Sequence, residues 1–183
     1  MLRSSPVGFI PSVDLDAVAA ALAPRLLAYA TARIGSREAA EDVAQDALTA
    51  LVRRWRLAGP PESPDAFAFA IARRRAGRVV AKRALLAPIH TLRHMIRDEA
   101  SVDQAYEDRR ELAIVRSALR ALSRADREAL LLRTVGELSF EEIAAISRTS
   151  TAAIKMRISR ARRRLAALLP EDANGRRTRA ARG

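Results

Sequence analysis

The stretch that decides the fold is residues 139–169, SFEEIAAISRTSTAAIKMRISRARRRLAALL. Ser139 is followed three residues later by Glu142, a capping box in which each side chain satisfies a free backbone donor at the start of a helix. This pair predicts a short helix over residues 140–146, a polar turn over 147–150 and a second helix over 151–169. The segment is therefore predicted to be a helix–turn–helix unit.

The second of these helices has two chemically different faces. One apolar stripe to dock the helix and one cationic face turned outward suit a helix that reads the major groove. The alternative is a surface helix of a bundle whose arginines are merely solvated, and the capped helix and polar turn in front of it favour DNA binding. The predicted buried stripe is Ile154, Ile158, Ala161, Leu165 and Leu168, and the outward face is Ala152, Lys155, Met156, Ser159, Arg160 and Arg163.

The composition of the chain points the same way. Its 183 residues include 33 Lys and Arg against 21 Asp and Glu, a formal net charge of +12. This balance favours a polyanionic partner, nucleic acid first and an anionic membrane surface second. No run of 18 apolar residues and no signal peptide is present, so no membrane association is expected. The absence of cysteine excludes disulfides, thiol catalysis and thiolate zinc sites, and it fits a cytoplasmic protein.

Enzymatic chemistry has little support in the sequence. It contains no glycine-rich phosphate loop, nucleophile elbow or His-bearing triad, so a protein without catalytic activity or cofactor is expected. His90 and His94 have the four-residue spacing that places two metal ligands on one helical face. No third ligand is evident, and two linker histidines are the favoured interpretation over a metal site.

Helical periodicity runs through the rest of the chain, and strand signals are nearly absent, which predicts an all-α fold. A first helix is predicted over residues 14–34, with Pro24 either kinking it or opening a second segment. The clearest pattern covers residues 37–57. Its apolar stripe is Ala40, Val43, Ala44, Ala47, Leu48, Leu51, Val52 and Trp55.

A second basic helix is predicted to begin at Pro64 with Ser63 as its cap. Its presence suggests contact with nucleic acid at two places, and a solvated charge run is an equal alternative because arginine is common throughout the chain. The residues predicted to point inward are Phe67, Ala70, Ile71 and Val79, and those predicted to be exposed are Arg73, Arg74, Arg75, Arg78, Lys82 and Arg83.

Breaks in these patterns predict two small helical domains. Pro88 is expected to end the second basic helix, and Ser123 with Asp126 is expected to open another helix in the second domain. The predicted order is an N-terminal arm (1–12), a helical domain (13–86), an acidic flexible linker (87–109), a helix–turn–helix domain (110–169) and a basic disordered tail (170–183).

Over about residues 15–169 the chain resembles bacterial RNA polymerase sigma factors of the sigma-70 family, specifically the small extracytoplasmic-function (ECF) group. The segment AEDVAQDAL at 40–48 is similar to the region-two helix of that family. The segments LSFEEIAAI at 138–146 and IKMRISRAR at 154–162 are similar to region four. The resemblance implies a non-enzymatic factor that binds core RNA polymerase and promoter DNA and directs transcription initiation.

The resemblance also implies roles for particular residues. Region two would dock on the clamp helices of the largest polymerase subunit and contact the minus-ten element. Region four would contact the flap of the second-largest subunit and the minus-thirty-five element, and an anti-sigma protein is a further candidate partner. The implied residues are Glu41, Asp42, Gln45 and Asp46 for polymerase; Phe67, Arg74, Arg75, Arg78 and Lys82 for the minus-ten region; and Lys155, Met156, Ser159, Arg160 and Arg163 for the minus-thirty-five region.

The residues of the region-two helix suit the first of these roles, because exposed acidic and polar groups on a basic protein can receive a basic partner helix. Compensation of the helix dipole would explain Glu41 and Asp42 but not Gln45 and Asp46. A stand-alone helix–turn–helix repressor or activator, which binds a palindrome as a dimer, is the alternative function. It would have no use for this helix.

Several residues depart from the family pattern, among them Phe67 and Ala68, where the family has tryptophan and leucine, and Ala153 and Ile154, where it has threonine and valine. Arg74 and Arg78 stand where the family usually has asparagine and aspartate, so the expected minus-ten surface is unusually basic. Arg148 occupies a turn position where glycine is common, because a positive φ is inexpensive for glycine.

Overall fold

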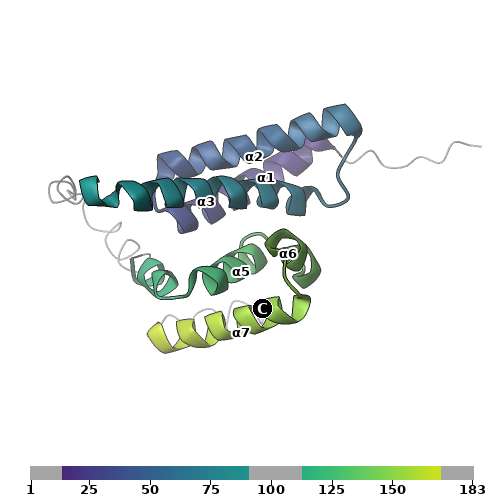
Figure 1. The fold of residues 1–183 in the computed structure, drawn as a ribbon. Helices are drawn as coiled ribbons and strands as arrows, with labels where there is room; N and C mark the ends of the chain where they lie inside the picture. Colours follow the sequence, from purple (N-terminus) through teal and green to yellow (C-terminus); the bar gives the residue numbers. More distant parts are fainter. Residues whose placement is uncertain (1–13, 91–112, 170–183) are drawn as a thin grey trace, which may run out of the picture.

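The computed structural model describes residues 14–90 and 113–169, and every regular element in these two ranges is a helix. The predicted all-α fold is confirmed. Figure 1 shows two layers, with α1, α2 and α3 in one and α5, α6 and α7 in the other. The helices are α1 (Leu15–Ile34), α2 (Arg37–Ala58), α3 (Pro64–His90), α5 (Arg124–Thr134), α6 (Phe140–Ser147) and α7 (Thr151–Leu168), with a further helical stretch at 113–120.

Side-chain caps set most of the helix starts. Ser36, Ser123 and Ser150 each accept a hydrogen bond from a backbone N–H in the first turn of α2, α5 and α7. Such a cap contributes typically about 1 kcal/mol relative to alanine. Gly35 ends α1 in the left-handed region, with φ of 79°. The helix bounds predicted from these local signals agree with the structure to within one or two residues.

The N-terminal domain, formed by α1, α2 and α3, is a three-helix bundle. Its core combines large apolar side chains with alanines, which are most numerous in α2 and α3. The Tyr29 ring of α1 meets the Phe69 ring of α3 edge to face, with centroids 5.6 Å apart. The core residues include Leu22, Leu26 and Ala30 of α1, Ala40, Val43, Ala47 and Leu51 of α2, and Ala68, Ala72 and Ala76 of α3.

The C-terminal domain, residues 113–169, packs α5 and α6 against α7. The predicted stripe of α7 is confirmed for Ile154, Ile158 and Ala161, which are fully buried or nearly so. Leu165 is only partly buried, and Leu168 is exposed. The stripe was therefore predicted one turn too long, because α7 extends beyond the helices that cover it.

Two predictions about α3 and one alternative for α1 are wrong. Pro88 does not end α3, which continues to His90, and Pro24 lies inside a continuous α1 rather than opening a new segment. A proline removes one helical hydrogen bond, and both helices continue despite that loss. The buried face of α3 is centred on Phe69 rather than on Phe67, which is only partly buried.

The helix α1 is long and apolar enough to cross a membrane by length and composition alone. Leu22, Leu26, Tyr29 and Ala30 of this helix are nevertheless buried against the rest of the protein. Their burial is what a core helix of the bundle requires. The predicted arm, the acidic linker from residue 91 onward, His94 and the basic tail lie outside the described residues.

The two domains share one continuous set of buried residues rather than two separate cores. The loop after α5 approaches the Phe69 ring so closely that a Cβ at Gly136 would lie 3.3 Å from Phe69 Cε1 and 2.6 Å from the Leu132 carbonyl oxygen. Only glycine fits at this approach without a backbone shift. The sequence did not predict this direct packing of the domains.

Candidate nucleic-acid interface

The helix–turn–helix forms as predicted. Ser139 Oγ accepts a hydrogen bond from Glu142 N at 3.1 Å, and Glu142 Oε2 accepts one from Ser139 N at 2.7 Å. Arg148 ends α6 in the left-handed region, with φ of 51° and ψ of 54°. The prediction that this turn position requires a positive φ is therefore confirmed, and an arginine adopts it here.

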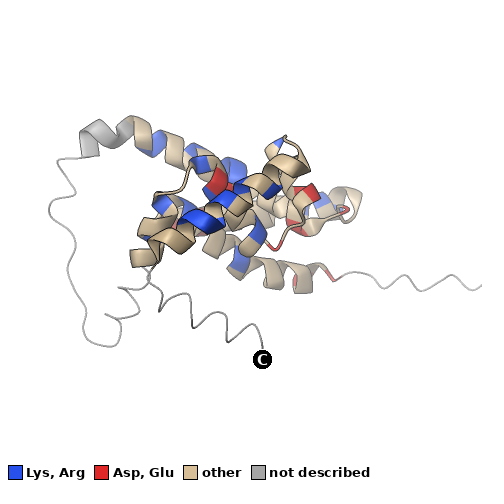
Figure 2. Cartoon of the chain, turned by 90° about the horizontal axis from the view of Figure 1, so that it is seen from below, with Lys and Arg blue, Asp and Glu red and all other residues tan. Residues whose placement is uncertain are grey.

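The outward face of α7 is free of core contacts. The predicted contact residues Lys155, Met156, Ser159, Arg160 and Arg163 are all exposed, and Met156 keeps 58% of its surface. Figure 2, viewed from the α7 side of the molecule, shows Lys and Arg distributed along the helices of this face. A row of donors on an exposed helix is suited to phosphate oxygens and to the acceptor atoms of guanine.

Two of these side chains are oriented by other residues of the same domain. Arg160 Nη2 of α7 donates a hydrogen bond to Asp126 Oδ1 at 2.9 Å, and Asp126 lies in the first turn of α5. Burial alone would raise the pKa of Asp126, but the hydrogen bonds from Arg160 and Ser123 outweigh burial and hold that pKa below its ordinary value. Lys155 Nζ lies 5.5 Å from the centre of the Phe140 ring, a cation–π distance.

The exposed side of α3 carries the second group of predicted contacts. Arg74, Arg75, Arg78 and Lys82 are exposed. Arg75 Nε lies 3.2 Å from Asp46 Oδ2 of α2, so this predicted DNA contact is already paired with a predicted polymerase contact. A cavity of about 200 Å³ lies between the two helices, lined by Asp46, Ala50, Ile71, Arg74, Arg75 and Arg78.

All four predicted polymerase contacts on α2 are exposed, but they lie on different sides of the helix. Glu41 and Gln45 line an open groove of about 560 Å³ between α1 and α2, whose other members include the apolar Leu27, Leu48 and Val52 and the basic Arg53 and Arg56. Asp46 faces α3 instead, and Asp42 lines neither hollow. The structure thus brings two of the four residues to a groove that can receive an apolar side chain as well as a charge.

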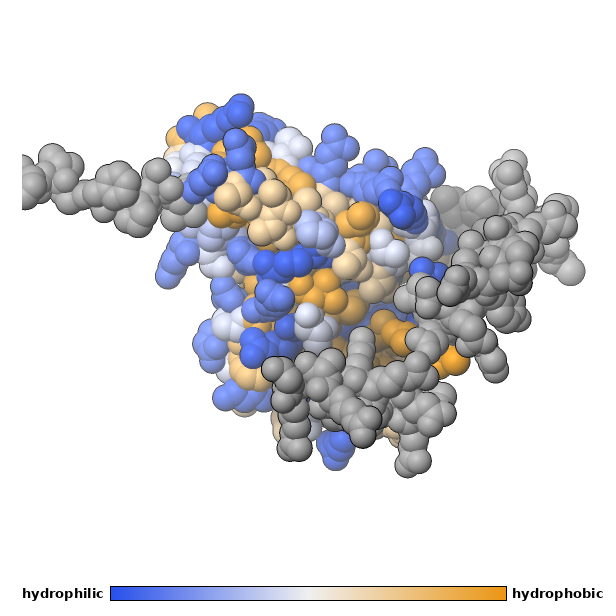
Figure 3. Space-filling model, turned by 180° about the vertical axis from the view of Figure 1, so that it is seen from behind, coloured by the Kyte–Doolittle hydropathy of each residue, from blue (hydrophilic) through white to orange (hydrophobic). Residues whose placement is uncertain are grey.

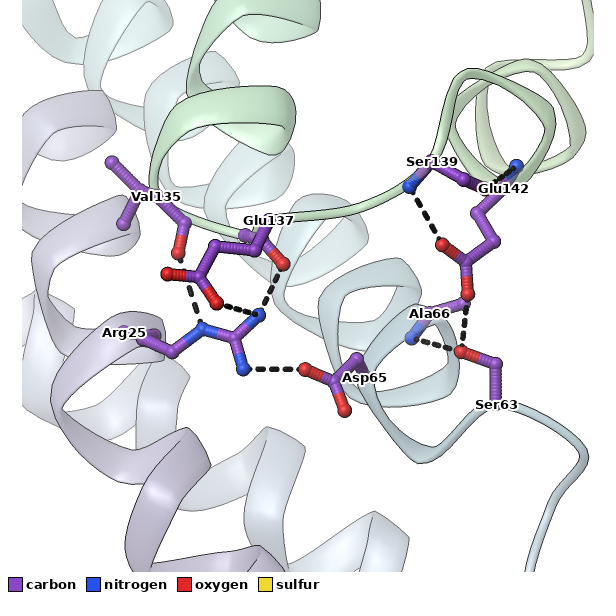
Figure 4. A network of polar contacts seen from close by, with 9 residues as sticks. Arg25, Ser63, Asp65, Ala66, Val135, Glu137, Ser139 and Glu142 are labelled. Atoms are coloured by element: carbon purple, nitrogen blue, oxygen red, sulfur yellow. Dashed lines mark hydrogen bonds and ion pairs between the residues drawn. The ribbon is translucent and has the colours of Figure 1, made fainter. Parts of the chain in front are cut away.

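The contacts that join the two domains were not predicted. Arg25 of α1 donates from Nη1 to Asp65 Oδ1 at 2.5 Å, from Nε to the Val135 carbonyl at 3.3 Å and from Nη2 to the Gly136 carbonyl. Figure 4 shows this guanidinium between the start of α3 and the loop that follows α5. Arg25 is therefore an arginine of the N-terminal domain that binds backbone of the C-terminal domain.

A second contact joins the starts of two helices, as Figure 4 also shows. Ser63 Oγ, which caps α3, donates to Glu142 Oε1 of α6 at 2.5 Å. This hydrogen bond is the main reason that the pKa of Glu142 lies below its ordinary value, and the bonds from Ser139 add to it despite partial burial. One carboxylate thus serves the capping box of α6 and the cap of α3.

The third contact is a buried ion-pair cluster. Glu128 of α5 accepts from Arg33 Nη2 of α1 at 2.9 Å and from Arg73 Nε of α3. The side chains of Arg33 and Glu128 are only 3% and 9% exposed. We call the contacts made by Arg25, Ser63 and Glu128 the interdomain junction. In sequence the only hint was Glu128, a carboxylate that directly precedes the apolar run of α5 over residues 129–132.

Comparison with known proteins gives the family. The model "Sigma-70 region 2" matches residues 18–85, and the model "Sigma-70, region 4" matches residues 112–165. A search among curated protein sequences finds no match. The two family models together cover the three-helix bundle and the helix–turn–helix described above.

Solved structures agree with the family models. One is the sigma factor RpoE, solved in complex with the anti-sigma factor NepR from Bartonella quintana, which is 26% identical to this chain. The superposition has a TM-score of 0.63 and covers 85% of this chain and 96% of RpoE. CnrH, solved in complex with the cytosolic domain of CnrY, is 26% identical with a TM-score of 0.58, covering 84% of this chain and 86% of that one. The chain therefore belongs to the sigma-70 family, in its ECF group, and directs transcription initiation as a sigma factor.

Proposed function

We propose that this sigma factor binds core RNA polymerase through α2 and reads two promoter elements, one with α3 and one with α7. The observation that carries the proposal is that one chain presents an acidic and polar helix face and two separate cationic helix faces, all exposed. Such a protein acts by binding rather than by catalysis, and we place it in the cytoplasm with the polymerase. In this proposal residues 13–86 and 110–169 are the two working domains.

The polymerase site is the exposed surface of α2 that carries Glu41, Asp42, Gln45 and Asp46, of which Glu41 and Gln45 lie at the groove and Asp46 lies toward α3. The groove beside Glu41 and Gln45 supports this assignment because its apolar walls have an acidic and polar part at these two residues, besides a basic part at Arg53 and Arg56. An amphipathic partner helix, such as a clamp helix, fits this groove when its apolar side chains enter it and its basic side chains lie at Glu41, away from Arg53 and Arg56. The flap of the second-largest subunit is the proposed partner of the C-terminal domain.

The promoter contacts divide between two helices. On α3, Arg74, Arg75, Arg78 and Lys82 contact the minus-ten region mainly through phosphates, and Phe67, near the start of the same helix, is a further proposed contact. On α7, Lys155 and Arg163 contact phosphates of the minus-thirty-five region, whereas Arg160 reads a base. Met156 and Ser159 of α7 complete this surface.

The interdomain junction has to open before both promoter elements are read together. Minus ten and minus thirty-five are about 25 base pairs apart, which is roughly 85 Å of duplex at 3.4 Å per base pair. The longest helix, α3 with 27 residues, spans about 40 Å. Two domains in direct contact through Glu128 cannot cover that distance.

Binding to core polymerase tests the α2 assignment. We expect the Asp42→Arg, Gln45→Arg double variant to lose co-elution with core polymerase while its far-UV circular dichroism stays unchanged. The control is Ala58→Arg with Glu62→Arg, which adds the same formal charge at exposed positions away from the groove. Equal binding by both double variants would remove the α2 assignment.

Salt dependence tests the α3 assignment. We expect Arg74→Ala and Arg78→Ala each to weaken open-complex formation on all promoters and to lower the salt slope by about one unit per lost phosphate contact. A change in sequence preference at unaltered affinity would instead make these arginines base readers. An anti-sigma factor is a further proposed partner, because RpoE was solved with one.

A further inference from the structure

A cavity of about 380 Å³ lies between the two domains and is lined mainly by arginine. The N-terminal domain contributes Arg33 from α1 and Arg73 and Arg74 from α3, and the C-terminal domain contributes Arg124 from α5 and Arg157 from α7. Glu128 is the one carboxylate among its lining residues. We call this space the arginine cavity. Its volume falls in the range of roughly 300–1,000 Å³ typical of small-molecule sites.

The charges of the arginine cavity do not balance within the described residues. Glu128 is shared by Arg33 and Arg73, and Arg74, Arg124 and Arg157 have no ion-pair partner in the described part of the chain. Like charges crowded at partial burial repel one another and destabilise the closed arrangement of the domains. A group of opposite charge in the cavity would remove this cost.

The crowding extends behind the cavity wall. Burial and then the nearby charges of Arg33, Arg120 and Arg124 lower the pKa of Arg127. The Nε atoms of Arg33 and Arg127 are both buried without a hydrogen-bond partner. The side chain of Arg33 is 3% exposed, so this guanidinium has almost no access to water.

The backbone leaves room for a ligand beside these side chains. A Cβ added at Gly77 of α3 would have only Arg124 Nη2 as a close neighbour, at 3.7 Å. The cavity is therefore free of other atoms beside this position. Arg124 and Ala125 lie in the first turn of α5, whose positive dipole end therefore adds to the field of the cavity. Figure 3 shows hydrophilic and apolar side chains intermixed over the described part of the face opposite to that of Figure 1.

We propose that the arginine cavity binds a small phosphorylated anion with linked phosphates, which bridges the two domains and holds them closed. Guanidinium groups match phosphate oxygens in a bidentate geometry and remain charged at all physiological pH values. The three arginines without an ion pair come from α3, α5 and α7, so a ligand with about three negative charges would neutralise them and touch both domains. Inorganic polyphosphates and nucleoside triphosphates share this chemistry.

Binding in this cavity would oppose promoter binding. The ligand would occupy Arg74, which is a proposed promoter contact. It would also stabilise the closed arrangement of the domains, whereas promoter binding requires the domains to separate. A ligand that binds only the closed form shifts the equilibrium toward it in proportion to one plus its concentration over its dissociation constant. The cellular level of such an anion would thereby set how much of the factor is free to act.

The chain is well suited to the measurement because it has one tryptophan, Trp55, and no cysteine. An acceptor dye on Ala167→Cys in α7 reports the distance between domains by energy transfer from Trp55. The full chain is titrated at constant ionic strength with tripolyphosphate, ATP without magnesium, orthophosphate, a short DNA duplex and an acidic peptide. We expect tripolyphosphate to raise the transfer efficiency and orthophosphate to have little effect.

Two kinds of variant locate the site. Replacing Arg124 and Arg157 with glutamine should weaken tripolyphosphate binding by at least about tenfold, because each loses a charge-assisted hydrogen bond. The control replaces Arg162 and Arg164, exposed arginines of α7 that do not line the cavity, and should change binding by less than about twofold. Gly77→Leu should fill the cavity and abolish binding with no change of charge, whereas Gly77→Ala should be tolerated.

The outcomes separate the possibilities. Closure by tripolyphosphate and by ATP supports a nucleotide ligand, and closure by tripolyphosphate alone supports an inorganic one. Equal weakening in the cavity and control variants, or binding retained in Gly77→Leu, would show that the anion follows overall charge and would overturn the proposal. Closure by the duplex or the peptide but not by tripolyphosphate would overturn it as well.

Discussion

Replacing Glu128 with glutamine should open the two domains without unfolding either one. Glu128 is the only residue of α5 with an ion pair to the N-terminal domain among the described residues, and both of its partners, Arg33 and Arg73, lie in that domain. Glutamine keeps the size of the side chain and removes its charge. Two guanidinium groups would then face each other across a neutral amide.

The magnitude follows from the burial of the pair. Arg33 and Glu128 are 3% and 9% exposed, and removing one partner of such a buried pair costs about 3–5 kcal/mol. The protein can avoid that cost by separating its domains, because Arg33 and Arg73 then regain water. The loss therefore cannot exceed the free energy that holds the domains together. A loss of about 3 kcal/mol lowers the ratio of closed to open protein by more than about a hundredfold.

Energy transfer from Trp55 to a dye on Ala167→Cys measures this ratio, and circular dichroism measures helix content. We expect transfer to fall in the Glu128→Gln variant while the helix content stays the same. Glu141→Gln is the control, because Glu141 is an exposed carboxylate of α6 with no ion pair among the described residues. Unchanged transfer in Glu128→Gln would refute the reasoning, and so would a loss of helix content.

Three further predictions concern the C-terminal domain. Arg160→Ala should cost on the order of 1–3 kcal/mol of binding free energy at one base pair of the minus-thirty-five element and relax the sequence preference there. In competition binding, Lys155→Ala should weaken the affinity for all sequences about equally. An unchanged sequence preference in Arg160→Ala would contradict the base-reading assignment. Arg148→Gly should raise the free energy of unfolding by up to about 1 kcal/mol, because φ of 51° is strained for arginine and free for glycine, and a lower thermal midpoint would count against it. The folded pKa of Glu142 lies below the ordinary value of 4.5, so its stabilisation is complete above pH 4.5 and is lost as the pH falls through the folded value; Glu142→Gln should flatten that part of an acid-unfolding curve.

The parts of the fold that depend on short-range signals were predictable from the sequence. The capping box at Ser139 and Glu142 and the apolar spacing of Ile154 and Ile158 act within a few residues of the chain, and both appear as predicted. The positive φ of Arg148 was expected from the family resemblance instead, because glycine is common at this turn position in that family. Local rules were sufficient wherever the cause and the effect lay in one element.

The inward face of α3 was harder to predict because the helix is rich in alanine. Alanine fits either side of a helix, so few large side chains fixed the phase, and the prediction that Phe67 lies at the centre of the inward face was wrong. The structure selects Phe69, since its ring packs against both Tyr29 and the Gly136 loop. That choice depends on contacts with residues far away in the chain, and the local spacing of apolar residues carries no information about them.

The candidate site was predictable to a similar extent. The exposure of the α7 face and of Glu41, Asp42, Gln45 and Asp46 followed from helical spacing. The pairing of Asp46 with Arg75 did not follow, nor did the interdomain junction. In a chain with 30% charged residues, a charge that will be buried looks like any surface charge until its partner is known.

The shared carboxylate of Glu142 gives the molecule a built-in probe of its own motion. Its Oε1 accepts from Ser63 of the other domain, while its Oε2 protects the backbone N–H of Ser139. When the domains part, the carboxylate loses one of its two anchors and the Ser139 amide becomes easier to exchange with solvent. Hydrogen exchange at this single amide should therefore follow domain opening from inside the DNA-reading unit, with no label attached.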